Sequence, residues 1–95
     1  MAEPKDAGQD FFKEAVEFHN KGDFKEAVEL YKKAMAAYGL DKKTLVLLGN
    51  AYYMGREFDK AEESYKNALS LDPNYARAYF NLGIVYEGLK RYEDA

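Results

Sequence analysis

Apolar residues recur along this chain at the spacing of an amphipathic helix. Phe11, Ala15 and Phe18 fall at i, i+4 and i+7, which places them on one helical face. The same kind of spacing returns in four later stretches, each separated from the next by a short polar or glycine-containing break. No run alternates apolar and polar residues as a half-buried strand does. The pattern therefore predicts an all-α fold of five helices.

The chain also matches itself at an offset of 34 residues. In the second and fourth stretches this offset aligns an aromatic residue, an alanine and a tyrosine, and in the third and fifth it aligns a leucine, a glycine and a tyrosine. The aligned residues are Phe24, Ala27 and Tyr31 with Phe58, Ala61 and Tyr65, and Leu48, Gly49 and Tyr52 with Leu82, Gly83 and Tyr86. Because small residues and aromatics recur together, each repeat is predicted to be a pair of packed helices.

Small residues at one repeat position indicate where the helices of a pair approach each other. Ala15, Gly49 and Gly83 share that position, with Ala27 and Ala61 predicted on the facing helix. A glycine in mid-helix costs about 1 kcal/mol relative to alanine. Two such glycines at the repeat offset therefore indicate that close helix packing requires them.

Capping residues mark the predicted helix ends. Asp23, Asp41 and Asn74 are predicted N-caps, because short polar side chains can accept hydrogen bonds from first-turn N–H groups. Gly39 and the pair Asp72–Pro73 are predicted to end the helices that precede them.

These features together resemble the tetratricopeptide repeat family. The resemblance is carried by Leu48-Gly49-Asn50-Ala51-Tyr52-Tyr53, Phe58-Asp59-Lys60-Ala61, Tyr65, Ala68-Leu69 and Leu71-Asp72-Pro73-Asn74. The inter-helix turn departs from the family pattern, with Arg56 where glycine is usual. The resemblance implies an α-solenoid, a right-handed superhelix of antiparallel helix pairs.

The repeat boundaries predict how the chain is organised. Residues 1–7 are a predicted polar tail and residues 8–95 a single domain. Within the domain, the first repeat covers 8–41, the second covers 42–75, and a truncated third repeat covers 76–95.

In the family, the first helices of successive repeats line a concave groove that holds extended peptides or partner helices. The resemblance implies a groove made of first-helix residues that face away from the paired helix: Phe12, Val16, His19, Lys43, Val46, Asn50, Tyr53, Arg77, Phe80, Asn81 and Ile84. Asn50 and Asn81 are candidates to hydrogen-bond a peptide backbone, and Phe12, Val46 and Phe80 form a candidate apolar surface. The alternative is that the asparagines are simply exposed and the apolar residues pack against neighbouring repeats.

Some family members hold the C-terminal carboxylate of heat-shock chaperones with lysine, arginine and asparagine side chains. Phe12 and Val16 stand at two of the corresponding positions, and in a register shifted by one repeat Val46 replaces the lysine. A carboxylate clamp is therefore not predicted. An amphipathic helix or a hydrophobic peptide fits this groove better.

The third repeat stops at Ala95, so its first helix, expected over about residues 75–89, is predicted to lack a partner helix. Its apolar side chains are then expected to lose burial and to form a candidate self-association face: Leu82, Tyr86, Leu89 and Tyr92. Two interpretations stay open: the chain is a fragment of a longer solenoid, or another copy covers this face. The alternative function is therefore a module that forms dimers or longer assemblies through this helix, face to face or by helix exchange.

Composition narrows the functional classes. The chain has 14 Lys+Arg and 17 Asp+Glu residues, a formal net charge of −3, and scattered basic residues, so nucleic acid is not a predicted partner. No apolar run is long enough for a membrane span and no signal core is seen, which predicts a cytoplasmic protein. Cysteine is absent and His19 has no sequence context for catalysis, so no enzyme activity, metal or other cofactor is predicted. The prediction is a non-enzymatic interaction module whose partner is a protein or peptide.

Overall fold

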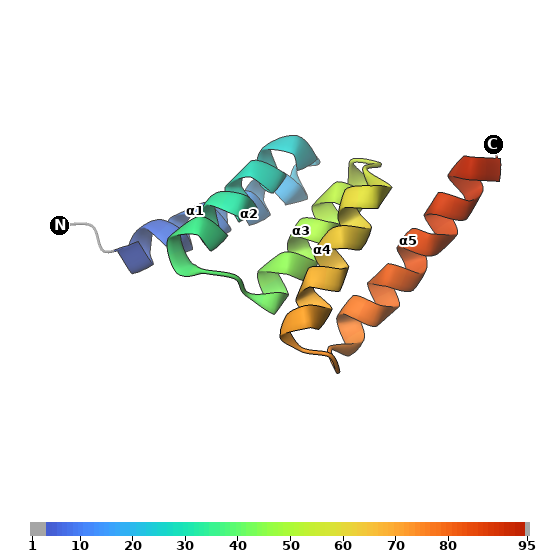
Figure 1. Cartoon of the computed structure of the whole chain (residues 1–95). Helices are drawn as coiled ribbons and strands as arrows, with labels where there is room; N and C mark the ends of the chain where they lie inside the picture. Colours follow the sequence, from blue (N-terminus) through green and yellow to red (C-terminus); the bar gives the residue numbers. More distant parts are fainter. Residues whose placement is uncertain (1–3, 95) are drawn as a thin grey trace.

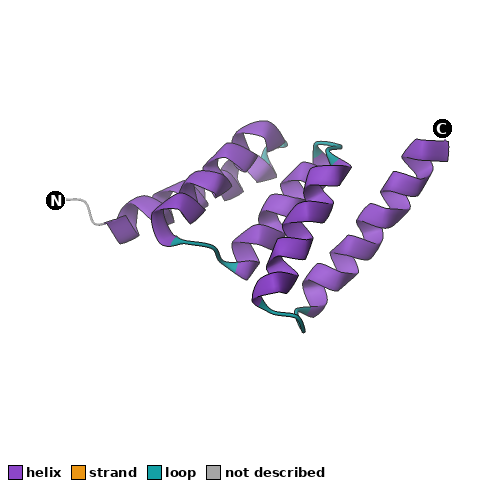
Figure 2. Cartoon of the chain, viewed as in Figure 1, coloured by secondary structure: helices purple, strands orange, loops and turns teal. Residues whose placement is uncertain are grey.

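The computed structural model describes the backbone of residues 4–94 and the side chains of residues 11–90. This part of the chain forms five α-helices and no strand, as the pattern predicted (Figure 2). The helices are α1 (Pro4–Asn20), α2 (Phe24–Tyr38), α3 (Lys42–Met54), α4 (Phe58–Leu71) and α5 (Ala76–Asp94). Because α1 begins at Pro4, the first helix includes part of the polar segment 1–7. Proline is well suited to the first position of a helix, where its missing N–H costs nothing.

The helices are arranged as neighbouring hairpins. Helix α1 packs on α2 and α3 packs on α4, while α2 contacts α3 and α4 contacts α5. Figure 1 shows the two pairs side by side, with α5 at the end of the row. The resulting body is elongated and thin, with principal extents of 53 × 29 × 15 Å. This is the shape of a short solenoid, in which each unit contacts only its neighbours.

The close approach of α3 and α4 depends on Gly49. A Cβ atom at this position would lie 2.5 Å from Cε1 of Tyr65, closer than real side-chain atoms come. Tyr65 is only 2% exposed, and Ala61 beside it is fully buried. The packing reason inferred from the sequence is therefore confirmed for this pair. At Gly83 on α5, by contrast, an added Cβ would meet no atom of the described residues within 4 Å.

Two of the three predicted N-caps are confirmed. The Asp23 carboxylate accepts a hydrogen bond from the N–H of Glu26 at 3.4 Å, and Asp41 accepts from both the N–H and the hydroxyl of Thr44 at 2.9 Å. The prediction for Asn74 is wrong, because α5 begins at Ala76. The N–H of Asn74 instead donates to the carboxylate of Asp72 at 3.1 Å, which shapes the turn before the helix.

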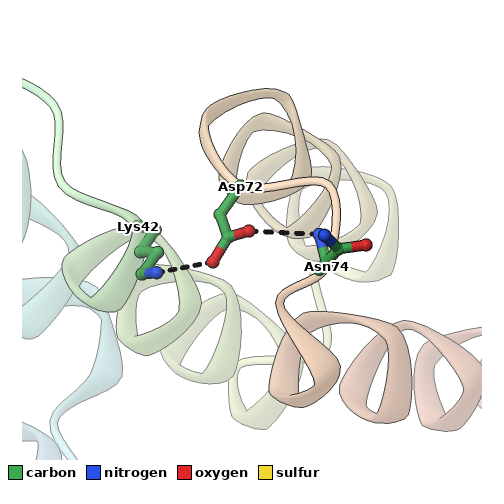
Figure 3. Close-up of polar contacts among 3 residues, drawn as sticks. All are labelled: Lys42, Asp72 and Asn74. Atoms are coloured by element: carbon green, nitrogen blue, oxygen red, sulfur yellow. Dashed lines mark hydrogen bonds and ion pairs between the residues drawn. The ribbon is translucent and has the colours of Figure 1, made fainter.

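Asp72 also connects the second repeat to the start of α5 (Figure 3). Its carboxylate lies 2.5 Å from Nζ of Lys42, at the beginning of α3, while it accepts the N–H of Asn74. The same ammonium lies 4.8 Å from the centre of the Tyr75 ring. The hydrogen bond to Lys42 lowers the pKa of Asp72 and raises that of Lys42. These contacts hold the α4–α5 turn against α3.

The last helix is longer than the sequence predicted. An inter-helix turn was expected after about residue 89, but α5 continues without interruption to Asp94. The corresponding turns after α1 and α3 contain Gly22 and Gly55, whereas this stretch reads Leu89-Lys90-Arg91. Leucine, lysine and arginine are good helix formers, so nothing local ends the helix.

The turn between α3 and α4 contains a strained residue. Arg56 has a φ of +66°, the left-handed region that favours glycine, while the matching residue of the first turn is Gly22 with a φ of +87°. A side chain in this region costs about 1 kcal/mol.

We therefore expect Arg56→Gly to raise the free energy of unfolding by about 1 kcal/mol, measured by urea denaturation followed by circular dichroism. Gly22→Ala should lower it by a similar amount, and an Arg56→Gly variant less stable than the parent would contradict this account.

Candidate functional site

Two surface hollows share one residue, Asn50 of α3. One hollow of about 500 Å³ lies between the C-terminal ends of α1 and α3 and the turn that leads from α1 into α2. A second hollow of about 480 Å³ lies between α3 and α5. The first is lined by His19, Asn20, Gly22, Phe24, Asn50, Tyr53 and Met54. The second is lined by Asn50, Ala76, Arg77, Phe80 and Asn81. We call these two hollows together the groove. The first helices supply most of its lining.

The side chain of Asn50 is held in place from two sides. Its carbonyl oxygen accepts hydrogen bonds from the hydroxyl of Tyr65 and from the amide of Asn81, the latter at 3.1 Å. Burial raises the pKa of Tyr65 above its ordinary value, so its hydroxyl remains protonated and can donate. With its oxygen occupied, Asn50 has its amide NH₂ left as a donor. Asn81 likewise has its carbonyl oxygen left as an acceptor.

Neither of these two remaining groups is bonded within the described side chains. None of those side chains contains a buried nitrogen or oxygen without a partner, so both groups are accessible from outside. A peptide backbone presents a C=O acceptor and an N–H donor. In an extended peptide the N–H and C=O of one residue lie on the same edge, so the pair formed by Asn50 and Asn81 can match one residue of such a backbone.

His19 lies in the first hollow with aromatic neighbours. Its Nδ1 is 3.1 Å from the hydroxyl of Tyr31, and its ring makes edge contacts with Phe24 and Tyr31 at 5.5 and 6.0 Å between centres. Burial lowers the pKa of His19 and raises that of Tyr31 to about 12. The neutral imidazole and the protonated phenol are therefore the forms that fit this contact.

Exposed apolar groups flank the asparagines. Met54 is 54% exposed, and Phe80 is 71% exposed beside Arg77. Tyr53 packs against Phe58 with 5.4 Å between ring centres and lines the first hollow. Ile84, also predicted as a groove residue, is 38% exposed on α5 but lines neither hollow. The groove thus offers apolar contact area on both sides of a polar centre.

The predicted apolar surface of Phe12, Val46 and Phe80 does not form. Val46 is 1% exposed, because α2, α4 and α5 all pack against α3 and leave little of the surface of this helix free. Phe12 and Val16 are partly buried against the core, and Phe12 lines a separate hollow with Met35 and Leu40. Phe12 contacts Tyr31 edge-on at 6.1 Å. Of these predicted groove residues, only Phe80 lines the groove.

Sequence reasoning missed two residues that matter here. Phe24, the first residue of α2, lines the groove, and Tyr65 of α4 positions Asn50 from behind. Both were assigned to packing alone. The available signal was the hydroxyl of Tyr65, which a purely hydrophobic position does not need.

The predicted self-association face on α5 is only partly exposed. Leu82 was expected to lose its burial but is 8% exposed, because α5 turns this side chain into the core against α3 and α4. Tyr86 is 46% exposed, as expected, whereas Leu89 is partly buried. The side chain of Tyr92 lies outside the described residues.

Over the described chain, no helix is both long and apolar enough to cross a membrane. Within the same limits, no group of His, Asp or Glu side chains is arranged to hold a metal ion. The cytoplasmic location stays a prediction.

Comparisons with known proteins agree with this architecture. Two repeat models match the chain, one for the tetratricopeptide repeat over residues 12–37 and one for the TPR repeat over residues 48–90. A human relative, tetratricopeptide repeat protein 28, is 35% identical over 77 residues, which cover 78% of this chain and 3% of that protein. The chain belongs to the tetratricopeptide repeat family. It spans between 3% and 56% of the lengths of the first curated relatives that it matches.

Two solved structures show the same fold. The Sgt2 TPR domain from Aspergillus fumigatus superposes with a TM-score of 0.82 at 22% identity, covering 90% of this chain and 57% of that one. The second TPR of Spaghetti (RPAP3), bound to the HSP90 peptide SRMEEVD, has a TM-score of 0.81 at 23% identity and covers 92% and 81%. The α-solenoid predicted from the sequence is therefore confirmed.

The lowered pKa of His19 makes stability depend on pH. Unfolded histidine takes up a proton near its ordinary pKa of 6.5, whereas burial delays this in the folded chain. The free energy of unfolding should therefore fall as the pH drops below about 6.5. Thermal melts between about pH 7.5 and 5.5 should show this loss, and His19→Gln should flatten the profile. An equally steep profile in His19→Gln would assign the pH dependence to other groups.

Proposed function

We propose that this chain is a non-enzymatic protein-interaction module whose groove holds an extended peptide segment of a partner protein. The observation that supports the proposal is the fixed and accessible amide pair of Asn50 and Asn81 at the junction of the two hollows. Asn50 would donate to a carbonyl of the ligand and Asn81 would accept an N–H. Because both amides are already held in place, little conformational entropy is lost when they bind.

Apolar side chains of the peptide would pack on either side of this contact. Tyr53 and Met54 provide the surface in the first hollow, and Phe80 provides it in the second. The family member RPAP3 was solved with a peptide, which supports peptide binding by this fold. Phe12 and Val16 lie partly buried against the core, so the proposed ligand contact does not run through them.

The proposal can be tested by selecting peptides of about nine residues from a random displayed library. Asn50→Ala should weaken the selected peptides about tenfold by fluorescence polarisation, since one positioned hydrogen bond and its orientation are lost. Asn81→Ala should also weaken binding while leaving the Tyr65 contact to Asn50 intact. Asn67→Ala, an exposed asparagine on α4, serves as the matched control and should have no effect. Peptides whose affinity is unchanged in both groove variants would remove the groove from the mechanism.

A second candidate function is self-association, and the packing around Gly83 favours it. Gly83 occupies the repeat position of Gly49, yet none of the described side chains fills the space that Tyr65 fills at Gly49. Tyr79 and Tyr86, on the same helix, are 55% and 46% exposed. We propose that a second copy of the chain can pack its own α5 against this open surface.

The mass of the chain in solution tests this second candidate. Because Leu82 is buried, a charge there would damage the core, whereas Gly83→Glu places charge and bulk in open space. If copies pair through α5, light scattering should give a dimer for the parent chain and a monomer for Gly83→Glu, with unchanged helical content. A monomeric parent across about a hundredfold range of concentration would exclude the pairing.

A further inference from the structure

The turn between α4 and α5 holds a lysine ammonium. Nζ of Lys42 lies 2.5 Å from the carboxylate of Asp72 (Figure 3) and 4.8 Å from the centre of the Tyr75 ring. Asp72 is also the C-cap of α4, so the ammonium lies at the C-terminal end of that helix. This end of a helix carries negative partial charge and favours a cation. The helix end, the carboxylate and the ring therefore all attract the charge that Lys42 supplies.

The first repeat has the same kinds of attractive groups at the equivalent positions, but a different residue in place of the lysine. At the offset of 34 residues Tyr38 corresponds to Asp72 and Asp41 corresponds to Tyr75, so the aromatic ring and the carboxylate have exchanged places. The lysine is replaced by Gly8, which has no side chain. Helix α2 also has no basic residue in its last turn. The turn between α2 and α3 therefore keeps the groups that attract an ammonium and lacks the lysine of the second repeat.

These groups line a hollow that lies apart from the groove. The hollow has a volume of about 480 Å³ and is bounded by Phe12 of α1, by the last turn of α2 with Tyr38, and by the following turn with Leu40 and Asp41. Among the described residues, it shares none with the groove. Leu40 is 67% exposed, and a lysine can lay its alkyl stem on such an apolar side chain while its ammonium reaches a polar partner.

The carboxylate of Asp41 is held in place and still has an oxygen available. As the N-cap of α3, its Oδ2 accepts both the N–H and the hydroxyl of Thr44 at 2.9 Å. No described side chain donates to its Oδ1 or forms an ion pair with it, and the residue is exposed. Because the capping bonds already fix this side chain, little conformational entropy is lost when it binds a cation.

We propose that this hollow binds the side chain of a lysine from a partner protein. The ammonium pairs with Asp41 at the C-terminal end of α2, the alkyl stem packs on Leu40, and Phe12 and Tyr38 supply aromatic surface. The net charge of −3 adds a general attraction for a cationic partner. This site is additional to the groove, so its failure would leave the proposed groove contact untouched.

The first test uses n-butylammonium, the lysine side chain alone, titrated into the isotope-labelled chain and followed by NMR of the backbone amides at constant ionic strength. The amide signals of Gly39, Asp41 and Thr44 should shift and saturate, and n-butanol, a neutral molecule of similar size, should shift them much less. Asp41→Asn should weaken the binding by at least about threefold, because asparagine can still cap α3 but carries no charge. Asp23→Asn is the matched control, since it removes the same charge from the N-cap of α2, outside this hollow, and it should leave the affinity unchanged.

Two outcomes of this titration would overturn the proposal. Equal shifts with butanol would show an apolar contact only, and an unchanged affinity in Asp41→Asn would show that this carboxylate does not hold the ammonium. If a thermal melt shows that Asp41→Asn unfolds, the parent chain still decides the matter. Added salt should weaken its binding of butylammonium, and binding that does not depend on salt would count against an ion pair.

Peptide selection then tests the lysine of a partner without the groove. A variant carrying Asn50→Ala and Asn81→Ala, and the same variant with Asp41→Asn added, are each used to select from one random peptide library. The first should select peptides enriched in lysine, and the second should lose that enrichment. A library that yields no lysine enrichment, or the same enrichment with both variants, would overturn the proposal. Neither result depends on the groove, because both of its asparagines are absent from these variants.

Discussion

The contact between Gly49 and Tyr65 is the constraint on which the rest of the structure depends. Only a residue without a Cβ allows the Tyr65 ring to lie against the backbone of α3, so α3 and α4 approach closely. That approach brings the Tyr65 hydroxyl to Asn50, and Asn50 in turn holds Asn81 on the next helix. The contact between Gly49 and Tyr65 in the core therefore positions the polar centre of the groove, and through Asn50 and Asn81 it connects α3 with α5.

The first and second repeats share this helix packing, but the buried tyrosine of each repeat contacts a different polar side chain. Tyr31 occupies in the first repeat the position that Tyr65 has in the second, and it is 1% exposed. The residue that corresponds to Asn50 is Val16, so the hydroxyl of Tyr31 contacts His19 instead. The same tyrosine thus holds an imidazole in one repeat and an amide in the next. The groove consequently has one polar centre, at the junction of the second and third repeats, with aromatic and apolar surface on both sides.

Much of the fold could be predicted because local signals and the repeat period agree. Apolar spacing indicated the helices, and Asp23 and Asp41 were recognisable as caps because a capping bond involves residues close in sequence. The errors arose where several elements meet. Val46 is buried because three helices cover α3, and Leu82 because α5 packs inward on α3 and α4, and neither fact is visible in one helix alone. Asn74 does not cap α5, because the helix begins at Ala76 and the Asn74 N–H donates to the Asp72 carboxylate, which Lys42 holds from a distant part of the chain.

The sequence by itself determined the number of helices, their pairing and the residues that allow close packing, because periodicity and side-chain size act through short-range geometry. It also marked Asn50, Asn81 and Arg77 as groove residues. Only the tertiary structure decided which atoms of those side chains remain accessible. Hydrogen-bond partners such as Tyr65 come from another helix, so the donor left on Asn50 and the acceptor left on Asn81 follow from packing in three dimensions.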